Sequence, residues 1–128
     1  MKRIAVSAQD RKGLESSVAA HFGRCPHYVV VDVEGQNVVS LQEIDNPHLS
    51  HHDPGEIPAF IHGLGAQVML AGGMGGRAVA FFQDYGIETV TGAAGTVREA
   101  LERYLRGETR GASPCRESLA HGHGQEGE

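Results

Sequence analysis

The fold is decided by residues 68–79, whose sequence is VMLAGGMGGRAV. The first four residues form a short apolar run that is typical of a buried strand. From Ala78 to Tyr85, apolar side chains recur at helical spacing, so a helix follows the glycines. A strand that runs into a helix in this way needs a parallel neighbouring strand, because the helix carries the chain back across the sheet. The stretch therefore predicts an α/β protein.

Toward the C-terminus, the alternation of strand and helix continues. Residues 87–90 form another short apolar strand, and residues 92–95 form a glycine-containing loop. Thr96 and Glu99 have the spacing of a capping box, in which each residue satisfies the backbone N–H of the other. The apolar stripe of the helix that they begin consists of Val97, Ala100, Leu101, Tyr104 and Leu105.

Toward the N-terminus, the pattern is that of strands. Residues 2–7 alternate between polar and apolar, and residues 28–33 are almost continuously β-branched, which is typical of an interior strand. A turn at residues 34–37 leads to a return strand at 38–44, so these two strands form a hairpin. Residues 8–27 are expected to be irregular.

A first helix is predicted between the hairpin and residue 68. Its apolar positions are Ile57, Phe60, Ile61 and Leu64. Asp53 has the chemistry of an N-cap, although Pro58 favours a start a few residues later. Together, the elements predict a five-stranded mixed sheet with three helices packed on its faces.

The length and composition bound the organisation of the chain. Its 128 residues, 40% of them apolar, suffice for one domain, which we place at residues 1–107. Residues 108–128 are rich in Gly, Ser, Glu and His and almost lack apolar side chains. We expect this tail to be disordered, because it buries too little surface to offset its ordering entropy.

Charge and hydropathy exclude several classes of function. The net charge is -5 without a basic cluster, so we expect no binding to nucleic acid. No apolar run is long enough to span a bilayer, and the N-terminal apolar stretch is too short for a signal peptide. We therefore expect a cytoplasmic protein without a membrane partner.

The glycine run at residues 72–76 is the first candidate site. It lies between a strand and a helix, where backbone N–H groups and the helix N-terminus favour an anion. Gly73, Gly75 and Ala78 also fit a G-x-G-x-x-A pattern, but the following strand ends without an acid for a ribose. Arg77 adds a positive charge at the rim. The alternative is a tight turn that requires small residues.

The segment HFGRCP at residues 21–26 is the second candidate. Thiolate and imidazole are ligands that suit copper, zinc and iron–sulfur species. Arg24 has the charge to pair with an anionic cluster or to lower the pKa of Cys25. Equally open is a structural interpretation, in which Phe22 fills the core and Cys25 is a small buried hydrophobe.

Histidines form two further candidate groups. His48, His51 and His52 lie in a polar loop, and of these His48 is the better ligand candidate because Asn46-Pro47 fixes a turn before it. Cys115, His121 and His123 lie in the tail, where the H-G-H spacing suits chelation. The chain lacks a nucleophile elbow, a P-loop and a spaced set of metal-binding carboxylates. We therefore expect that it is not an enzyme.

Several segments, read in order, resemble one known family. They are Phe22-Gly23-Arg24-Cys25-Pro26, Asn46, the run from Gly72 to Ala78, Tyr85-Gly86-Ile87, and Gly95-Thr96-Val97-Arg98-Glu99-Ala100. This pattern resembles the dinitrogenase iron–molybdenum cofactor biosynthesis family, which includes nitrogenase cofactor carriers and the orange protein with its molybdenum–copper–sulfide cluster. The resemblance covers residues 1 to about 106.

The resemblance implies a ribonuclease-H-like fold without the nuclease acids. It also implies a carrier of a metal–sulfur cluster, of Fe-Mo-S, Mo-Cu-S or Fe-S type, with donor and acceptor proteins as partners. Weak homo-oligomerisation is a separate expectation. The implied cofactor-binding residues are His21, Phe22, Gly23, Arg24, Cys25, Gly72, Gly73, Met74, Gly75, Gly76 and Arg77. The candidate metal ligands are Cys25, His48, Cys115, His121 and His123.

Three alternatives stay open at this point. The first is a zinc- or copper-binding redox or metal-homeostasis module that uses the Cys/His tail. The second is a nucleotide-binding protein or small enzyme that uses residues 72–76. The third is an interaction domain in which the glycine run is only a turn.

Overall fold

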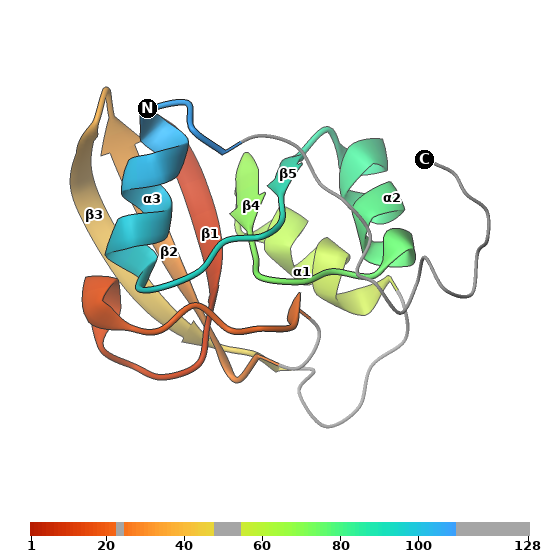
Figure 1. Cartoon of the computed structure of the whole chain (residues 1–128). Helices are drawn as coiled ribbons and strands as arrows, with labels where there is room; N and C mark the ends of the chain where they lie inside the picture. Colours follow the sequence, from red (N-terminus) through yellow and green to blue (C-terminus); the bar gives the residue numbers. More distant parts are fainter. Residues whose placement is uncertain (23–24, 48–54, 110–128) are drawn as a thin grey trace.

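A computed structural model describes residues 1–22, 25–47 and 55–109 of the chain. Five strands and three α-helices form one α/β unit (Figure 1). The strands are β1 (Lys2–Ala8), β2 (His27–Glu34), β3 (Asn37–Asp45), β4 (Val68–Leu70) and β5 (Glu88–Val90). The helices are α1 (Glu56–Gly63), α2 (Gly76–Tyr85) and α3 (Val97–Leu105), with a 3₁₀ turn, η1, at Gly13–Glu15.

The strands make one open mixed sheet in the order β3-β2-β1-β4-β5. β2 runs antiparallel to both β1 and β3, whereas β4 is parallel to β1 and to β5. This arrangement confirms the predicted hairpin and the parallel second half. The hairpin contains one irregularity, because Val33 pairs with Val38 and Asp32 with Ser40. Val39 is therefore the extra residue of a β-bulge.

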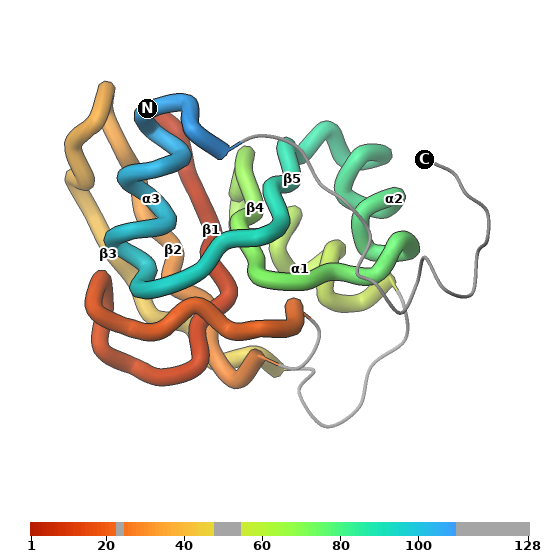
Figure 2. The backbone as a smooth tube through the Cα atoms, viewed as in Figure 1, coloured from red at the N-terminus to blue at the C-terminus, as the bar shows by residue number. Residues whose placement is uncertain are grey.

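The helices cover the two faces of the sheet separately (Figure 2). On one face, α1 and α2 bury Ile57, Ile61 and Phe82 against strand residues such as Met69. On the other face, α3 buries its apolar stripe against the strand side chains that point toward it. These strand residues are Ile4, Val6, Val29, Val31, Val33, Val68, Leu70 and Val90. The alternation of inward residues along each strand thus supplies two cores.

Two details differ from the sequence-based expectation. α1 begins at Glu56 after Gly55, so Asp53 is not its N-cap. The helix starts later because Pro58 then lies in the first turn, where a backbone N–H has no acceptor within the helix. The segment expected to be irregular also contains η1. Its later part lies against α3, since Val97 N–H donates to the carbonyl of Ser16 at 2.8 Å.

The described helices are all too short, or too polar, to cross a membrane. The capping box of α3 is confirmed by both of its hydrogen bonds. Thr96 Oγ1 accepts from the Glu99 N–H at 3.1 Å, and Glu99 Oε1 accepts from the Thr96 N–H at 2.9 Å.

Candidate functional site

The structure brings together the beginning of the HFGRCP segment and the glycine run. His21 forms a parallel bridge with Gly73, and the Phe22 N–H donates to the Gly73 carbonyl at 2.8 Å. The glycine run follows β4, and β4 is the parallel neighbour of β1. Both segments therefore lie at the edge of the sheet where β1 and β4 end, which is where open α/β sheets bind ligands.

Gly72 is required by a close backbone contact. A Cβ atom at this position would lie 2.6 Å from the Ala19 carbonyl oxygen and 3.1 Å from the Ala20 Cα atom. Both neighbours are backbone atoms, so neither can move away as a flexible side chain would. For Gly72, the tight-turn alternative therefore has a direct steric basis, and the contact holds the His21 segment against the glycine run.

The N-terminus of α2 is uncapped by side chains and carries no acid. Gly75 is the N-cap residue and Gly76 begins the helix, with Arg77 exposed in the first turn. By contrast, the first turns of α1 and α3 contain Glu56 and Glu99. A cation in the first turn opposes the helix dipole unless an anion lies nearby. This end of α2 is therefore electrostatically suited to an anionic ligand.

Beneath these backbone groups, the side chains of Phe22 and Met74 are buried. The Phe22 ring packs edge-on against Phe82 with centroids 5.3 Å apart, and it lies 6.0 Å from the Tyr28 ring. Phe22 thus fills the core, as the structural interpretation of its segment predicts. Both residues support the site from below, whereas His21 is exposed beside it.

Cys25 is also fully buried, and burial raises the pKa of its thiol. Its neighbours include the Tyr28 and Ser7 hydroxyls, which favour the thiolate less than burial opposes it. Ser7 Oγ has no hydrogen-bond partner of good geometry among the described residues. In this arrangement Cys25 is a neutral thiol, and a role as a thiolate ligand would require the segment to open.

Asn46 holds the Cys25 segment in place. Its Nδ2 donates to the Cys25 carbonyl at 3.0 Å, and its N–H donates to the Pro26 carbonyl at 2.9 Å. Asn46 is thus a positioning residue, which the sequence marks through the Asn-Pro pair and through its place in the family resemblance. Ser7 had no sequence signal at all, since its burial depends on the packing of β1 against β2.

Several predicted residues lie outside the described part of the chain. Within residues 1–22, 25–47 and 55–109, no group of three or more His, Cys, Asp or Glu side chains is arranged to hold a metal ion. The predicted residues outside these ranges are Gly23, Arg24, His48, His51, His52, Cys115, His121 and His123.

The fold and this edge define a class: a small α/β domain with an anion-favouring glycine loop beside β1 and β4. The comparison with known families is specific. Residues 1–107 match the family model described as dinitrogenase iron-molybdenum cofactor. The chain belongs to this family, as the sequence resemblance predicted.

The chain is also similar to solved structures and to one curated protein. The apo form of the orange protein from Desulfovibrio gigas is 33% identical, with a TM-score of 0.77 over 89% of this chain and 95% of that one. The crystal structure of PH0822 is 35% identical, with a TM-score of 0.75 over 84% and 94%. The uncharacterized protein MJ0580 of Methanocaldococcus jannaschii is 24% identical over 92 residues, which are 70% of this chain and 78% of that protein.

Proposed function

We propose that this protein binds and carries an anionic metal–sulfur cofactor at the glycine run, and that it is a carrier rather than an enzyme. The observation that supports the site is the N-terminus of α2, which combines Gly75, Gly76 and exposed Arg77 without an acid in the first turn. The family supports a part in iron–molybdenum cofactor biosynthesis or cluster carriage. The metal composition of the cargo, Fe-Mo-S, Mo-Cu-S or Fe-S, is a finer proposal.

The described residues have distinct roles in this proposal. Backbone N–H groups of the first α2 turn and the Arg77 guanidinium attract the anion. His21 lies exposed at the rim, where an imidazole is available as a borderline ligand. Phe22 and Met74 hold the two segments on a packed floor. Ligation by one exchangeable side chain suits a cofactor that must be passed to an acceptor.

The overall charge of the chain makes the local groups decisive. The net charge of -5 repels an anion at long range. At physiological ionic strength, however, charges further apart than about 8 Å are largely screened. Binding therefore depends on the groups in direct contact with the cargo, so that removing one of them has a large effect.

We also infer that the sheet is of the ribonuclease-H-like type. The strand order β3-β2-β1-β4-β5, in which β2 alone runs opposite to the other four strands, supports this. The zinc- or copper-binding alternative depends on Cys115, His121 and His123, which lie outside the described residues. It stays a prediction and is distinguished by the first experiment below.

The first experiment is metal and acid-labile sulfide analysis of protein purified anaerobically from its own host. The proposal expects molybdenum, copper or iron together with sulfide, and charge-transfer bands in the absorption spectrum. Zinc alone, lost on deletion of residues 108–128, would instead support the metal-homeostasis alternative.

The second experiment tests the site itself with tetrathiomolybdate, a small anion of molybdenum and sulfide. Arg77→Gln is expected to weaken binding about tenfold, because it removes a charge-assisted contact. Arg103→Gln is the matched control, since Arg103 is exposed in the last turn of α3 on the other face of the sheet. Equal affinities of the two variants would place the cargo elsewhere.

A further inference from the structure

β3 is a long edge strand with a free side. It pairs with β2 on one side, and among the described residues no strand pairs with its other side (Figure 1). β3 has nine residues, whereas β5 at the opposite edge has three. Unpaired N–H and C=O groups along an edge are a template for another strand. β3 therefore presents the larger template of the two edges.

The exposed side chains of this strand are unusually apolar. Among the described residues, five large hydrophobic side chains are exposed, and three of them, Val38, Val39 and Leu41, lie on β3. Proteins commonly protect a free edge with lysine, proline or a bulge. β3 contains no lysine or proline, and its bulge at Val39 leaves residues 40–45 regular. The edge is thus weakly protected against pairing.

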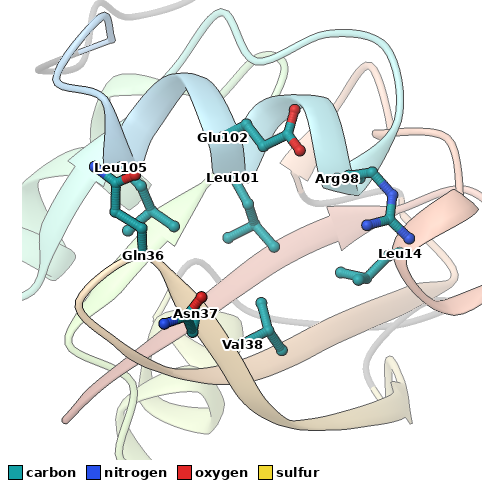
Figure 3. A pocket seen from close by; sticks show the side chains of 8 residues that line it. All are labelled: Leu14, Gln36, Asn37, Val38, Arg98, Leu101, Glu102 and Leu105. Atoms are coloured by element: carbon teal, nitrogen blue, oxygen red, sulfur yellow. The ribbon is translucent and has the colours of Figure 1, made fainter.

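A cavity of about 300 Å³ extends this apolar surface onto the α3 face (Figure 3). Its apolar half comes from Val38 of β3, Leu101 and Leu105 of α3, and Leu14 of η1, and its polar half from Gln36, Asn37, Arg98 and Glu102. The Leu101 and Val38 side chains point toward each other across it (Figure 3). A strip of apolar side chains, bordered by polar ones, therefore runs from the free edge to the helix, on a face where an added strand would place alternate side chains.

The charge pattern of β3 favours an antiparallel second copy as its occupant. Its first six residues are uncharged, and its acids, Glu43 and Asp45, lie near the end. Within its own chain, Asp45 pairs with Arg11 and His27, and Glu43 accepts from the Gly13 N–H. Two copies related by a two-fold axis pair antiparallel, so the acidic end of each lies beside the uncharged end of the other. For the two sheets to continue each other with the same face on the same side, the two-fold axis must pass beside one residue of β3, which then pairs with its own copy. A centre at Leu41 brings the bulged Val39 near the second copy's Glu43, whereas a centre at Gln42 would bring it near Asp45, which Arg11 already holds. We assign the pairing centred on Leu41.

We propose that β3 pairs antiparallel with the β3 of a second copy of this chain, which joins the two sheets edge to edge. β2 and β1 separate β3 from β4, where the glycine run begins. The dimer therefore leaves the proposed cofactor site uncovered, and it does not depend on that proposal.

The test is sedimentation equilibrium of the metal-free full chain from micromolar to millimolar concentration. The wild-type chain is expected to dimerise. Val39→Lys is expected to strengthen dimerisation and Val39→Glu to weaken it, because in the pairing centred on Leu41 this residue lies near Glu43 of the second copy. Opposite-charge cross-strand pairs, made twice in the dimer, change the dissociation constant by roughly 2- to 30-fold. Val39 is half exposed, so both variants are expected to fold, which circular dichroism checks.

Ala80→Lys and Ala80→Glu are the matched controls, because Ala80 is exposed on α2 and the net charge changes identically. Hydrogen exchange adds a second measurement, with amide protection in residues 38–44 expected to rise with protein concentration. A chain that is monomeric throughout would overturn the proposal. So would a dimer that responds equally to the Val39 and Ala80 pairs, or one without added protection in β3.

Discussion

Gly72 illustrates how one residue positions the candidate site. A Cβ atom there would collide with backbone atoms of Ala19 and Ala20. We predict that Gly72→Ala lowers the free energy of unfolding by about 1–3 kcal/mol, as overpacking does. Urea denaturation measures this. Gly63→Ala is the control, since a Cβ there meets open space and alanine is the better helix former. Equal stability of both variants would mean that the segments are not in close contact.

The buried position of Cys25 predicts a slow reaction of its thiol. Its thiol is fully buried, and burial raises its pKa. In a Cys115→Ala background, we therefore expect Cys25 to react with iodoacetamide at pH 8 at least about a hundredfold more slowly in the folded protein than in urea. Rapid labelling of the folded chain would show that the segment opens readily, which would favour Cys25 as a ligand.

At the scale of elements, the capping box of α3 is the best-defined local interaction. We predict that Thr96→Ala lowers the free energy of unfolding by about 1 kcal/mol, because the Glu99 N–H loses its acceptor. Arg103→Ala, at an exposed position of the same helix, is expected to change it by less than about 0.5 kcal/mol. Urea denaturation of the two variants measures these changes, and the midpoint of Thr96→Ala is expected to be the lower of the two. An unchanged midpoint for Thr96→Ala would mean that α3 is held by packing alone.

For the whole molecule, buried hydroxyl and thiol groups predict the response to alkaline pH. Burial raises the pKa values of Cys25, Tyr28 and Tyr104 above their ordinary values. The stability that they contribute is complete below the ordinary thiol pKa of 9.0. Above it, the unfolded chain loses protons that the folded chain retains, so stability falls by as much as about 1.4 kcal/mol per pH unit for each of the buried groups Cys25 and Tyr28. The contribution of Tyr104 is smaller, because this side chain is partly exposed and solvent screens it.

Denaturation by urea at pH 8, 9, 10 and 11 measures this loss. Cys25→Ala is expected to be less stable at pH 8, because it leaves a small cavity, but to lose stability less steeply between pH 9 and 10. The same slope in both proteins would mean that Cys25 titrates in the folded state as it does in the unfolded one.

Most helices and strands, and much of their arrangement, follow from local patterns in the sequence. The alternation of strand and helix after residue 68 predicted the parallel half of the sheet, and residues 28–44 predicted the hairpin. The capping box was predictable because it is a contact between residues three apart. Such features depend on neighbours in the chain, so the sequence carries them directly.

The surroundings of each candidate residue, in contrast, depend on contacts between distant parts of the chain. The pairing of His21 with Gly73 joins residues 52 positions apart, and the contact of Gly72 with Ala19 is of the same kind. The sequence left Cys25 open between ligand and buried hydrophobe, because burial depends on how strands pack rather than on spacing. The free edge of β3 likewise follows from the order of the strands, which is a property of the assembled sheet.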